Sequence, residues 1–522
     1  MSVKEKIGSI FPSESEIPEE FRLERYIIQR EYLINGELRI WTGEMQKVLS
    51  PVCIKNSSGI SQKIIGQYPL LTKKESLEAL DSAVWAYADG RGLWPGLSVN
   101  ERVEHIEEFI SKMQKKRNEI VLLLMWETGK SYQGAEKEFD RTVDYVFKII
   151  GALKDLKSVS SKFITEQGII GHIYHAPLGV VLCVGPFNYP LFETFTTLMP
   201  ALIMGNTVIL KPPKLGVLLH YPLLSAFQSS FPPGVVNTVY GDSSVVLPPL
   251  ISTGTIDCLA FIGKGKVADM LISGHPKPYR LKSVLGLEAK NPAIILSDAD
   301  IDLAVYECMR GSLAFNGQRC TALKILFVHS GISDVFLMKC VELLGKMICG
   351  MPWEKDVFIT PLPEAGKTKY LTGLLKDALK HGARIMNECG GTVNRTFFYP
   401  ALLYPVHEEM RLYSEEQFGP LVPIVPFDDI ETPLHYVVQS RYGQQVSIFG
   451  NNQETIADLT DVFIKQVCRV NINSKCQRGP DSFPFAGRKD SGEGTLSISD
   501  ALRLFSVRTI VAERESKKTK KY

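Results

Sequence analysis

The sequence has almost no net charge, no long hydrophobic run and no closely spaced cysteine pairs. Its 522 residues include 59 Lys and Arg against 57 Asp and Glu. This balance argues against a nucleic-acid partner, which requires a positively charged face. No apolar stretch approaches the roughly 20 residues of a membrane-spanning helix, and residues 1–20 lack the apolar core of a signal peptide. We therefore expect a cytoplasmic protein with neither a membrane nor a nucleic-acid partner.

Metal and phosphate motifs are also missing. The ten cysteines are scattered and form no CxxC pair, and the HExxH motif is absent, so we expect no metal site. A chain of this length builds a core without disulfides. Segments 129–131 (GKS) and 366–368 (GKT) end like phosphate-binding loops. The glycine that such a loop needs five residues earlier is replaced by Leu124 and Pro361.

The middle of the chain alternates between strands and helices. Helical periodicity covers 73–156. Strands are expected at 180–184, 207–210, 235–240 and 258–262, with helices at 191–203 and near 220–229. The alternation resumes over 291–472. Repeated strand–helix–strand units predict two parallel α/β sheets, with ligands at the carboxyl ends of their strands.

Six segments rich in proline, glycine and polar residues follow predicted strands or lie near the C-terminus. They are GPFNYP at 185–190, KPPK at 211–214, LEAKNP at 287–292, FNGQRCTA at 315–322, EEQFGP at 415–420 and QRGPDSFPF at 477–485. In this order and approximate spacing, the chain resembles the aldehyde dehydrogenases from about residue 30 to 515. NGQRCTA and QRGPDSFPF are similar to the branch of non-phosphorylating, NADP-dependent glyceraldehyde-3-phosphate dehydrogenases.

The resemblance implies an α/β fold with three parts: a Rossmann-like coenzyme domain, a second α/β catalytic domain and a small β oligomerisation arm. The expected boundaries are a flexible N-terminal arm at 1–29, a coenzyme domain at 30–155 and 176–286, a catalytic domain at 287–472, an oligomerisation and C-terminal segment at 156–175 and 473–515, and a basic tail at 516–522. The alternating residues 505–511 are typical of an edge strand that pairs across a subunit boundary. A homodimer or homotetramer is therefore implied.

The resemblance also implies a catalytic centre. Cys320 matches the nucleophile that forms a thiohemiacetal and then a thioester, and adjacent Arg319 is expected to favour its thiolate. The side-chain amide of Asn188 and the backbone N–H of Cys320 match the oxyanion donors, each worth about 3 kcal/mol in comparable acyl chemistry.

Glu288 is the expected general base for releasing the acid, but here the sequence departs from the family pattern. Aligned on Lys290 without gaps, the family's glutamate falls on Gly286, and Glu288 stands two residues later. We expect a shifted loop to place the Glu288 carboxylate. The alternatives are that Glu288 is an exposed loop carboxylate, or that nearby Glu416 takes over.

The implied cofactor is NADP. Lys214 stands where NAD-preferring relatives often carry a glutamate, and a charge pair about 4 Å apart is worth up to about 4 kcal/mol near a surface. Lys211 matches the family's ribose-binding lysine. The loop with Gly263 and Lys264 is expected to reinforce phosphate binding, or its lysines simply face solvent at a helix start. The remaining expected contacts are Glu416, on the nicotinamide ribose, and Phe418.

The implied substrate is a small anionic aldehyde. Tyr189 and three arginines (Arg141, Arg319 and Arg478) match the residues that hold the phosphate of glyceraldehyde 3-phosphate, and guanidinium groups suit phosphate or carboxylate. Succinic semialdehyde is therefore an alternative. A further alternative is a non-catalytic relative that keeps the fold as a binding or structural protein.

Overall fold

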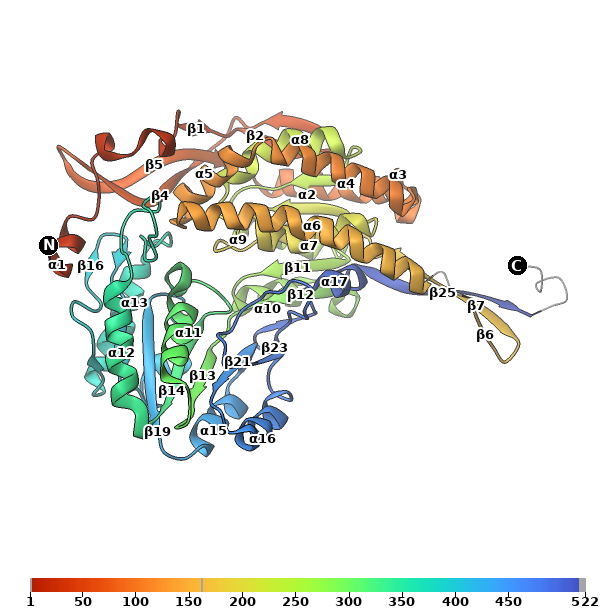
Figure 1. The fold of residues 1–522 in the computed structure, drawn as a ribbon. Helices are drawn as coiled ribbons and strands as arrows, with labels where there is room; N and C mark the ends of the chain where they lie inside the picture. The colour runs from red at the N-terminus through yellow and green to blue at the C-terminus, as the bar shows by residue number, and fades with distance from the viewer. Residues whose placement is uncertain (1, 161–162, 516–522) are drawn as a thin grey trace.

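A computed structural model describes residues 2–160 and 163–515. The basic tail 516–522 lies outside the described residues. Two α/β layers stacked on one another form the body, and a long β arm projects from one side (Figure 1). No helix among the described residues is long and apolar enough to cross a membrane.

The first layer is built on a six-stranded sheet in the order β10-β9-β8-β11-β12-β24. Its first five strands are parallel and its last pair is antiparallel. The strands are β8 (Val180–Val184), β9 (Thr207–Lys211), β10 (Val236–Thr238), β11 (Cys258–Ile262), β12 (Lys282–Gly286) and β24 (Gly492–Glu493). β8 and β9 are buried along their whole length, as expected for parallel strands covered on both faces.

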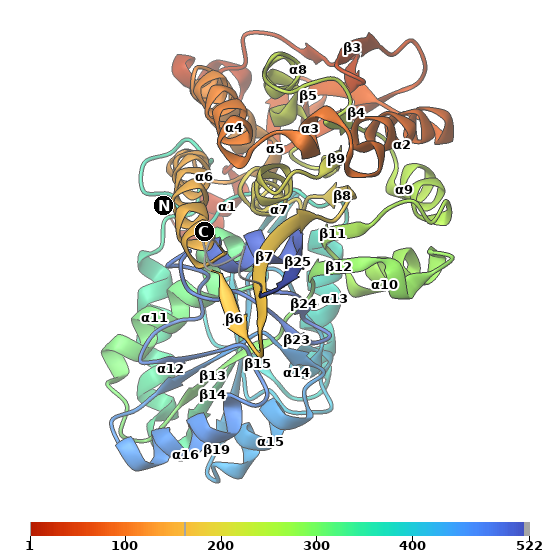
Figure 2. The same ribbon diagram turned by 90° about the vertical axis from the view of Figure 1, so that its right-hand side faces the viewer.

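Helices cover both faces of this sheet. In Figure 2, α7 (Phe192–Ile203) lies on one face, and α9 (Ser243–Ser252) and α10 (Gly265–Gly274) lie on the other. α2 (Lys73–Tyr87) packs against α9, and α4 (Val99–Gln114) and α6 (Tyr132–Ser160) pack against α7. α5 (Arg117–Thr128) and α8 (Leu224–Ser230) complete this layer. Every residue of α7 is buried, so this helix is a core element.

The second layer is built on a seven-stranded sheet in the order β15-β18-β19-β14-β13-β21-β22. Its strands are β13 (Asn291–Ile295), β14 (Leu323–His329), β15 (Arg384–Ile385), β18 (Ala401–Tyr404), β19 (Leu421–Phe427), β21 (Gln445–Phe449) and β22 (Arg469–Ile472). Its main helices are α11 (Ile301–Leu313), α12 (Ser333–Lys346), α13 (Lys367–Lys380), α15 (Glu431–Gln439) and α16 (Gln453–Phe463). The predicted α/β class with two sheets is confirmed.

The arm is a three-stranded antiparallel sheet, order β25-β7-β6. Its strands are β6 (Ile164–Glu166), β7 (Ile169–Pro177) and β25 (Ser506–Arg514). β25 is an edge strand paired with β7 of the same chain. α17 (Ile498–Leu504) leads into it.

Two expected segments differ from the structure. Residues 1–29 are not a flexible arm: they contain α1 (Val3–Gly8), and Ile7 and Phe11 are buried against the body because these apolar side chains find a core to enter. The stretch from 473 to 493 is not part of the β arm. Within it, β24 completes the first sheet, and β23 (Arg488–Lys489) pairs with β20 (Tyr442–Gly443) beside the second.

Candidate active site

The predicted nucleophile Cys320 follows a strained turn between α11 and β14. Phe315, Asn316 and Gly317 all have positive φ, of 50°, 56° and 72°, a conformation that costs free energy for residues other than glycine. A Cβ on Gly317 would lie 2.7 Å from a backbone oxygen. Reciprocal bonds between Asn316 and Thr360, at 3.1 and 3.0 Å, hold the turn. The position of Cys320 is therefore fixed by the turn before it.

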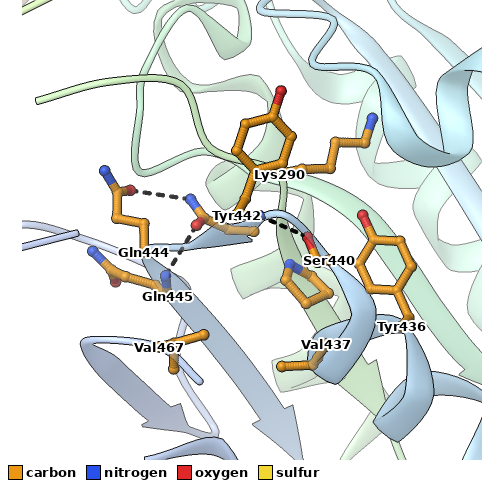
Figure 3. Close-up of a pocket in the computed structure, with 10 residues that line it drawn as sticks. Lys290, Tyr436, Val437, Ser440, Tyr442, Gln444, Gln445 and Val467 are labelled. Atoms are coloured by element: carbon orange, nitrogen blue, oxygen red, sulfur yellow. Dashed lines mark hydrogen bonds between the residues drawn. The ribbon is translucent and has the colours of Figure 1, made fainter. Parts of the chain in front are cut away.

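The Cys320 carbonyl is fixed as well. It accepts hydrogen bonds from Asn291 Nδ2 at 2.7 Å and from Lys324 Nζ at 3.0 Å. Asn291 is held in turn by Gln444 Oε1 at 3.3 Å and by the backbone N–H of Gln445, which donates to Asn291 Oδ1 at 3.1 Å. Gln444 and Gln445 lie together at one wall of a small pocket that Asn291 also lines (Figure 3).

The thiol of Cys320 rests in a mixed electrostatic environment. Burial raises its pKa, and the negative charge of Glu193 raises it further, whereas Lys324 and Arg478 lower it. The net direction is upward. The expectation that Arg319 supplies the positive neighbourhood differs from this structure, in which Lys324 and Arg478 are the cations that favour the Cys320 thiolate.

Asn188 lies in the turn between β8 and α7 and faces the nucleophile segment. Its Nδ2 donates to the carbonyl of Gln318 at 2.9 Å, two residues before Cys320. A side-chain amide has two N–H donors, so one is left for a substrate oxygen. The backbone N–H of Cys320 has no acceptor among the described residues. The structure thus brings two available donors together at the Cys320 segment.

A buried lysine, Lys130, holds the Asn188 turn. Its Nζ donates to the Asn188 carbonyl at 2.9 Å and pairs with Glu138. The same ammonium lies 3.7 Å from the ring centroid of Tyr189 and 4.6 Å from that of Phe315. Glu138 also accepts two backbone N–H groups at the start of α7, at 3.1 Å each. This cluster ties the Asn188 turn to the Cys320 turn.

Glu288 is engaged at the start of α10. Its Oε2 accepts the backbone N–H of Gly265 at 2.7 Å, the first residue of α10. A carboxylate is stable there because the helix dipole favours negative charge at this end. Among the described residues, Glu288 forms no hydrogen bond with Cys320 or Asn188. The structure brings those two together and leaves Glu288 beside α10.

The expected coenzyme residues lie at the carboxyl ends of β9 and β11. Lys211 ends β9 and is buried, and burial lowers its pKa to about 8. Its ammonium forms no ion pair in the part of the chain that the structure describes. Lys214 is exposed, three residues further on. Gly263 and Lys264 lie immediately before α10. Lys211 and Lys214 thus place two amino groups at the carboxyl end of β9 that form no ion pair among the described residues.

Glu416 and Phe418 belong to the segment 415–420 that precedes β19. Glu416 Oε1 accepts from Lys324 Nζ at 2.6 Å and from the backbone N–H of Ala289 at 3.1 Å. Phe418 packs edge-on against Phe187, with centroids 5.8 Å apart. Glu416 therefore stabilises the segment that carries Glu288. The negative charge of Glu416 is balanced by the buried ammonium group of Lys324.

The predicted substrate arginines are already engaged. Arg141 donates to both carboxylate oxygens of Asp481, at 2.9 and 2.5 Å. Arg478 pairs with Glu193, and its Nε lies 3.8 Å from Asp481 Oδ1. Arg319 donates to a hydroxyl at 3.0 Å and has no ion pair within the described ranges. Only one of the three guanidinium charges is therefore left without a partner carboxylate.

Sequence reasoning missed five residues that shape this site: Lys130, Glu193, Lys324, Gln444 and Asp481. Three of them had a local signal. Lys324 follows Cys320 by four residues in a mostly apolar strand, and Glu193 follows the post-strand Asn188 by five. Asp481 follows Arg478 by three residues in the 477–485 segment. Lys130 and Gln444 meet the site through tertiary packing.

No group of three or more histidine, cysteine, aspartate or glutamate side chains is placed to hold a metal ion in residues 2–160 and 163–515. The same residues contain only free cysteines.

Comparison with known proteins defines the class. The family model "Aldehyde dehydrogenase family" matches residues 50–511, and the chain belongs to this family. Among curated relatives, the NADP-dependent glyceraldehyde-3-phosphate dehydrogenase of Streptococcus equinus is 31% identical over 473 residues, covering 89% of this chain and 94% of the relative.

Solved structures agree on the fold. The NADP complex of the NADP-dependent glyceraldehyde-3-phosphate dehydrogenase from Bacillus halodurans superposes with a TM-score of 0.84 at 29% identity, covering 94% of this chain and 100% of the other. Escherichia coli lactaldehyde dehydrogenase superposes equally well, at 0.85 with 25% identity and the same coverage. The similarity therefore defines the family and its fold and leaves the aldehyde open.

Proposed function

We propose that this aldehyde dehydrogenase oxidises glyceraldehyde 3-phosphate to 3-phosphoglycerate with NADP and without inorganic phosphate. The observation that carries the proposal is the arrangement of the Cys320 segment: its backbone is held by Asn291 and Lys324, and two N–H donors, Asn188 Nδ2 and the backbone N–H of Cys320, are available there. Similarity to relatives named for this activity supports the choice of substrate.

Cys320 would act as the nucleophile. Its thiolate attacks the aldehyde carbon, and the carbonyl oxygen becomes an oxyanion that the two donors stabilise. Bound NADP supplies a hydride acceptor. The product left on Cys320 is then a thioester, which water must hydrolyse.

Glu288 is our proposed base for hydrolysis of the thioester. Glu416 is less suited, because its Oε1 already accepts hydrogen bonds from Lys324 Nζ at 2.6 Å and from the backbone N–H of Ala289 at 3.1 Å. To act, the Glu288 carboxylate must leave the Gly265 N–H. An anion bound at the start of α10 would compete for that N–H and release the carboxylate.

Lys211 and Lys214 support NADP as the cofactor. The buried ammonium of Lys211 lacks an ion-pair partner in the described structure, and exposed Lys214 adds a second cation at the end of the same strand. A 2′-phosphate would neutralise this charge. The Gly263–Lys264 loop and Phe418 complete the proposed coenzyme contacts.

A second substrate, succinic semialdehyde, is favoured by one specific observation. Asp481 and Glu193 already neutralise Arg141 and Arg478, so the site carries less positive charge than a dianionic phosphate ideally needs. A single carboxylate would suit the remaining charge of Arg319. Tyr189, in the turn between β8 and α7, is the remaining proposed substrate contact.

The test is reduction of NADP by D-glyceraldehyde 3-phosphate in phosphate-free buffer, with succinic semialdehyde assayed in parallel. Steady turnover with the phosphorylated aldehyde supports the proposal. Turnover with succinic semialdehyde alone selects the second candidate. No reduction with either aldehyde, with Cys320 unreactive toward iodoacetamide, indicates a non-catalytic relative.

We also propose that the chain forms a homodimer or homotetramer through its β arm. Val507, Ile510 and Val511 on the edge strand β25 are 49%, 62% and 58% exposed. An exposed apolar edge strand is normally covered by another chain. Light scattering at two salt concentrations measures the molecular mass of the protein in solution, and this mass tests the proposed homodimer or homotetramer.

A further inference from the structure

Glu193 is a buried carboxylate in the first turn of α7. Its side chain is 11% exposed, and it pairs with Arg478, whose side chain is 5% exposed. A buried carboxylate requires a charge partner or hydrogen bonds to compensate for lost hydration. Arg478 is that partner.

The pair belongs to a group of charged side chains around the ring of Phe192. Arg478 and Arg141 stack on the ring of Phe192, with guanidinium carbons 5.0 and 4.0 Å from its centroid. Asp481 contacts both arginines. The negative charge of Glu193 and the positive charge of Arg478 are both close enough to Cys320 to change its acidity in opposite directions.

Arg478 is incompletely satisfied by its partners. Nη2 donates to the Leu496 carbonyl at 3.2 Å, and Nη1 pairs with Glu193. Its Nε is buried and has no hydrogen-bond acceptor among the described residues. A guanidinium with an unused donor gains from an additional or better-placed anion.

We infer that Glu193 is a specificity-determining residue: it occupies Arg478 in the free site, and the anionic end of the substrate competes with its carboxylate for that guanidinium. The inference rests on the proposed function in one respect, that the substrate is an anionic aldehyde. Glu193 lowers the positive potential that an incoming anion meets. The penalty grows with the charge of the anion, so Glu193 sets how well the enzyme distinguishes dianionic from monoanionic and neutral aldehydes.

The direct test compares Glu193→Gln with wild type on three aldehydes: glyceraldehyde 3-phosphate, succinic semialdehyde and propanal. We expect kcat/KM to rise about tenfold for the phosphorylated aldehyde, by less for succinic semialdehyde and by less than about twofold for propanal. Parallel changes for all three, or a fall confined to the phosphorylated aldehyde, would overturn the inference. The matched control is Glu342→Gln, the same substitution at an exposed position of α12, where Glu342 pairs with Lys346.

A second measurement needs no substrate and therefore separates this inference from the proposed function. Iodoacetate is an anion and iodoacetamide is neutral, so the ratio of their alkylation rates at Cys320 reports the local potential. We expect Glu193→Gln to raise this ratio about tenfold and Glu342→Gln to leave it unchanged. An unchanged ratio in Glu193→Gln overturns the inference even if the enzyme oxidises an anionic aldehyde.

Loss of a buried partner can destabilise the fold, so the alkylation test is repeated on the Arg478→Gln background. There, adding Glu193→Gln removes an unpaired carboxylate instead of creating an unpaired guanidinium. We expect the ratio to rise from Arg478→Gln to the double variant. A constant ratio across these two variants also overturns the inference.

Discussion

The carboxylate of Glu288 lies 2.7 Å from the backbone N–H of Gly265 and caps the start of α10. The residue expected to act as a base is therefore engaged at a helix N-terminus, where a dinucleotide phosphate would also be stabilised. One carboxylate thus links the proposed coenzyme position to the proposed hydrolysis step.

Replacing Glu288 with alanine should tighten NADP binding. The substitution removes a negative charge and frees the Gly265 N–H for a phosphate oxygen, so we expect the Kd to fall about three- to tenfold. Isothermal titration calorimetry on wild type, Glu288→Ala and the exposed control Glu342→Ala measures it. Weaker binding in Glu288→Ala alone would contradict competition at α10.

Glu288→Gln should separate acylation from hydrolysis. A glutamine keeps the size of the side chain but cannot take a proton from water. We expect a burst of reduced cofactor equal to the enzyme concentration, followed by little turnover, in stopped-flow absorbance. A steady rate equal to wild type would assign the base to another group.

Lys324→Met should make the Cys320 thiol less acidic. Lys324 lowers the pKa of Cys320 against the upward effects of burial and Glu193, so removing its charge moves the pKa further up. The alkylation rate with iodoacetamide should then require a higher pH to reach its half-maximum, and the rate at neutral pH should fall. A shift of the pH–rate profile of alkylation to lower pH in Lys324→Met would contradict the expected effect of Lys324 on the pKa of Cys320.

Lys130→Met should damage both stability and the acylation rate. It leaves the Glu138 carboxylate buried without its cation, a loss of about 3 kcal/mol or more, and removes the bond that holds the Asn188 carbonyl. Urea unfolding measures the first effect and the burst rate the second. Adding Glu138→Gln should recover part of the stability but not the burst rate, because the Asn188 turn stays released.

The sequence predicts those structural features that depend on residues close together in the chain. The run at 180–184 predicts β8 because every residue in it is apolar, and the motif around Cys320 indicates the segment of the proposed nucleophile. The apolar residues Ile7, Phe11 and Ile17 are buried, but they have no regular spacing in the sequence. Their packing against the body therefore could not be predicted, and the sequence suggests a flexible segment at 1–29.

Long-range charge pairing was not predictable. Arg141 and Asp481 are separated by 340 positions, and Glu193 and Arg478 by 285. An isolated arginine gives no sign of its eventual partner, so the sequence suggested three free guanidinium groups for an anion. The direction of the Glu288 side chain also depends on tertiary structure, because it is fixed by the start of a helix more than twenty residues away.

The docked N-terminal segment has a mechanical consequence. Asn394 in β16 (Val393–Asn394) donates to the Ile7 carbonyl at 2.8 Å, and Trp126 in α5 donates to the Phe21 carbonyl at 2.8 Å. The segment from Ile7 to Phe21 thus connects the two α/β layers, because it is bonded to the second layer at one end and to the first layer at the other. A hinge motion that separates the two layers would have to stretch this segment or release it, so the segment restricts such a motion.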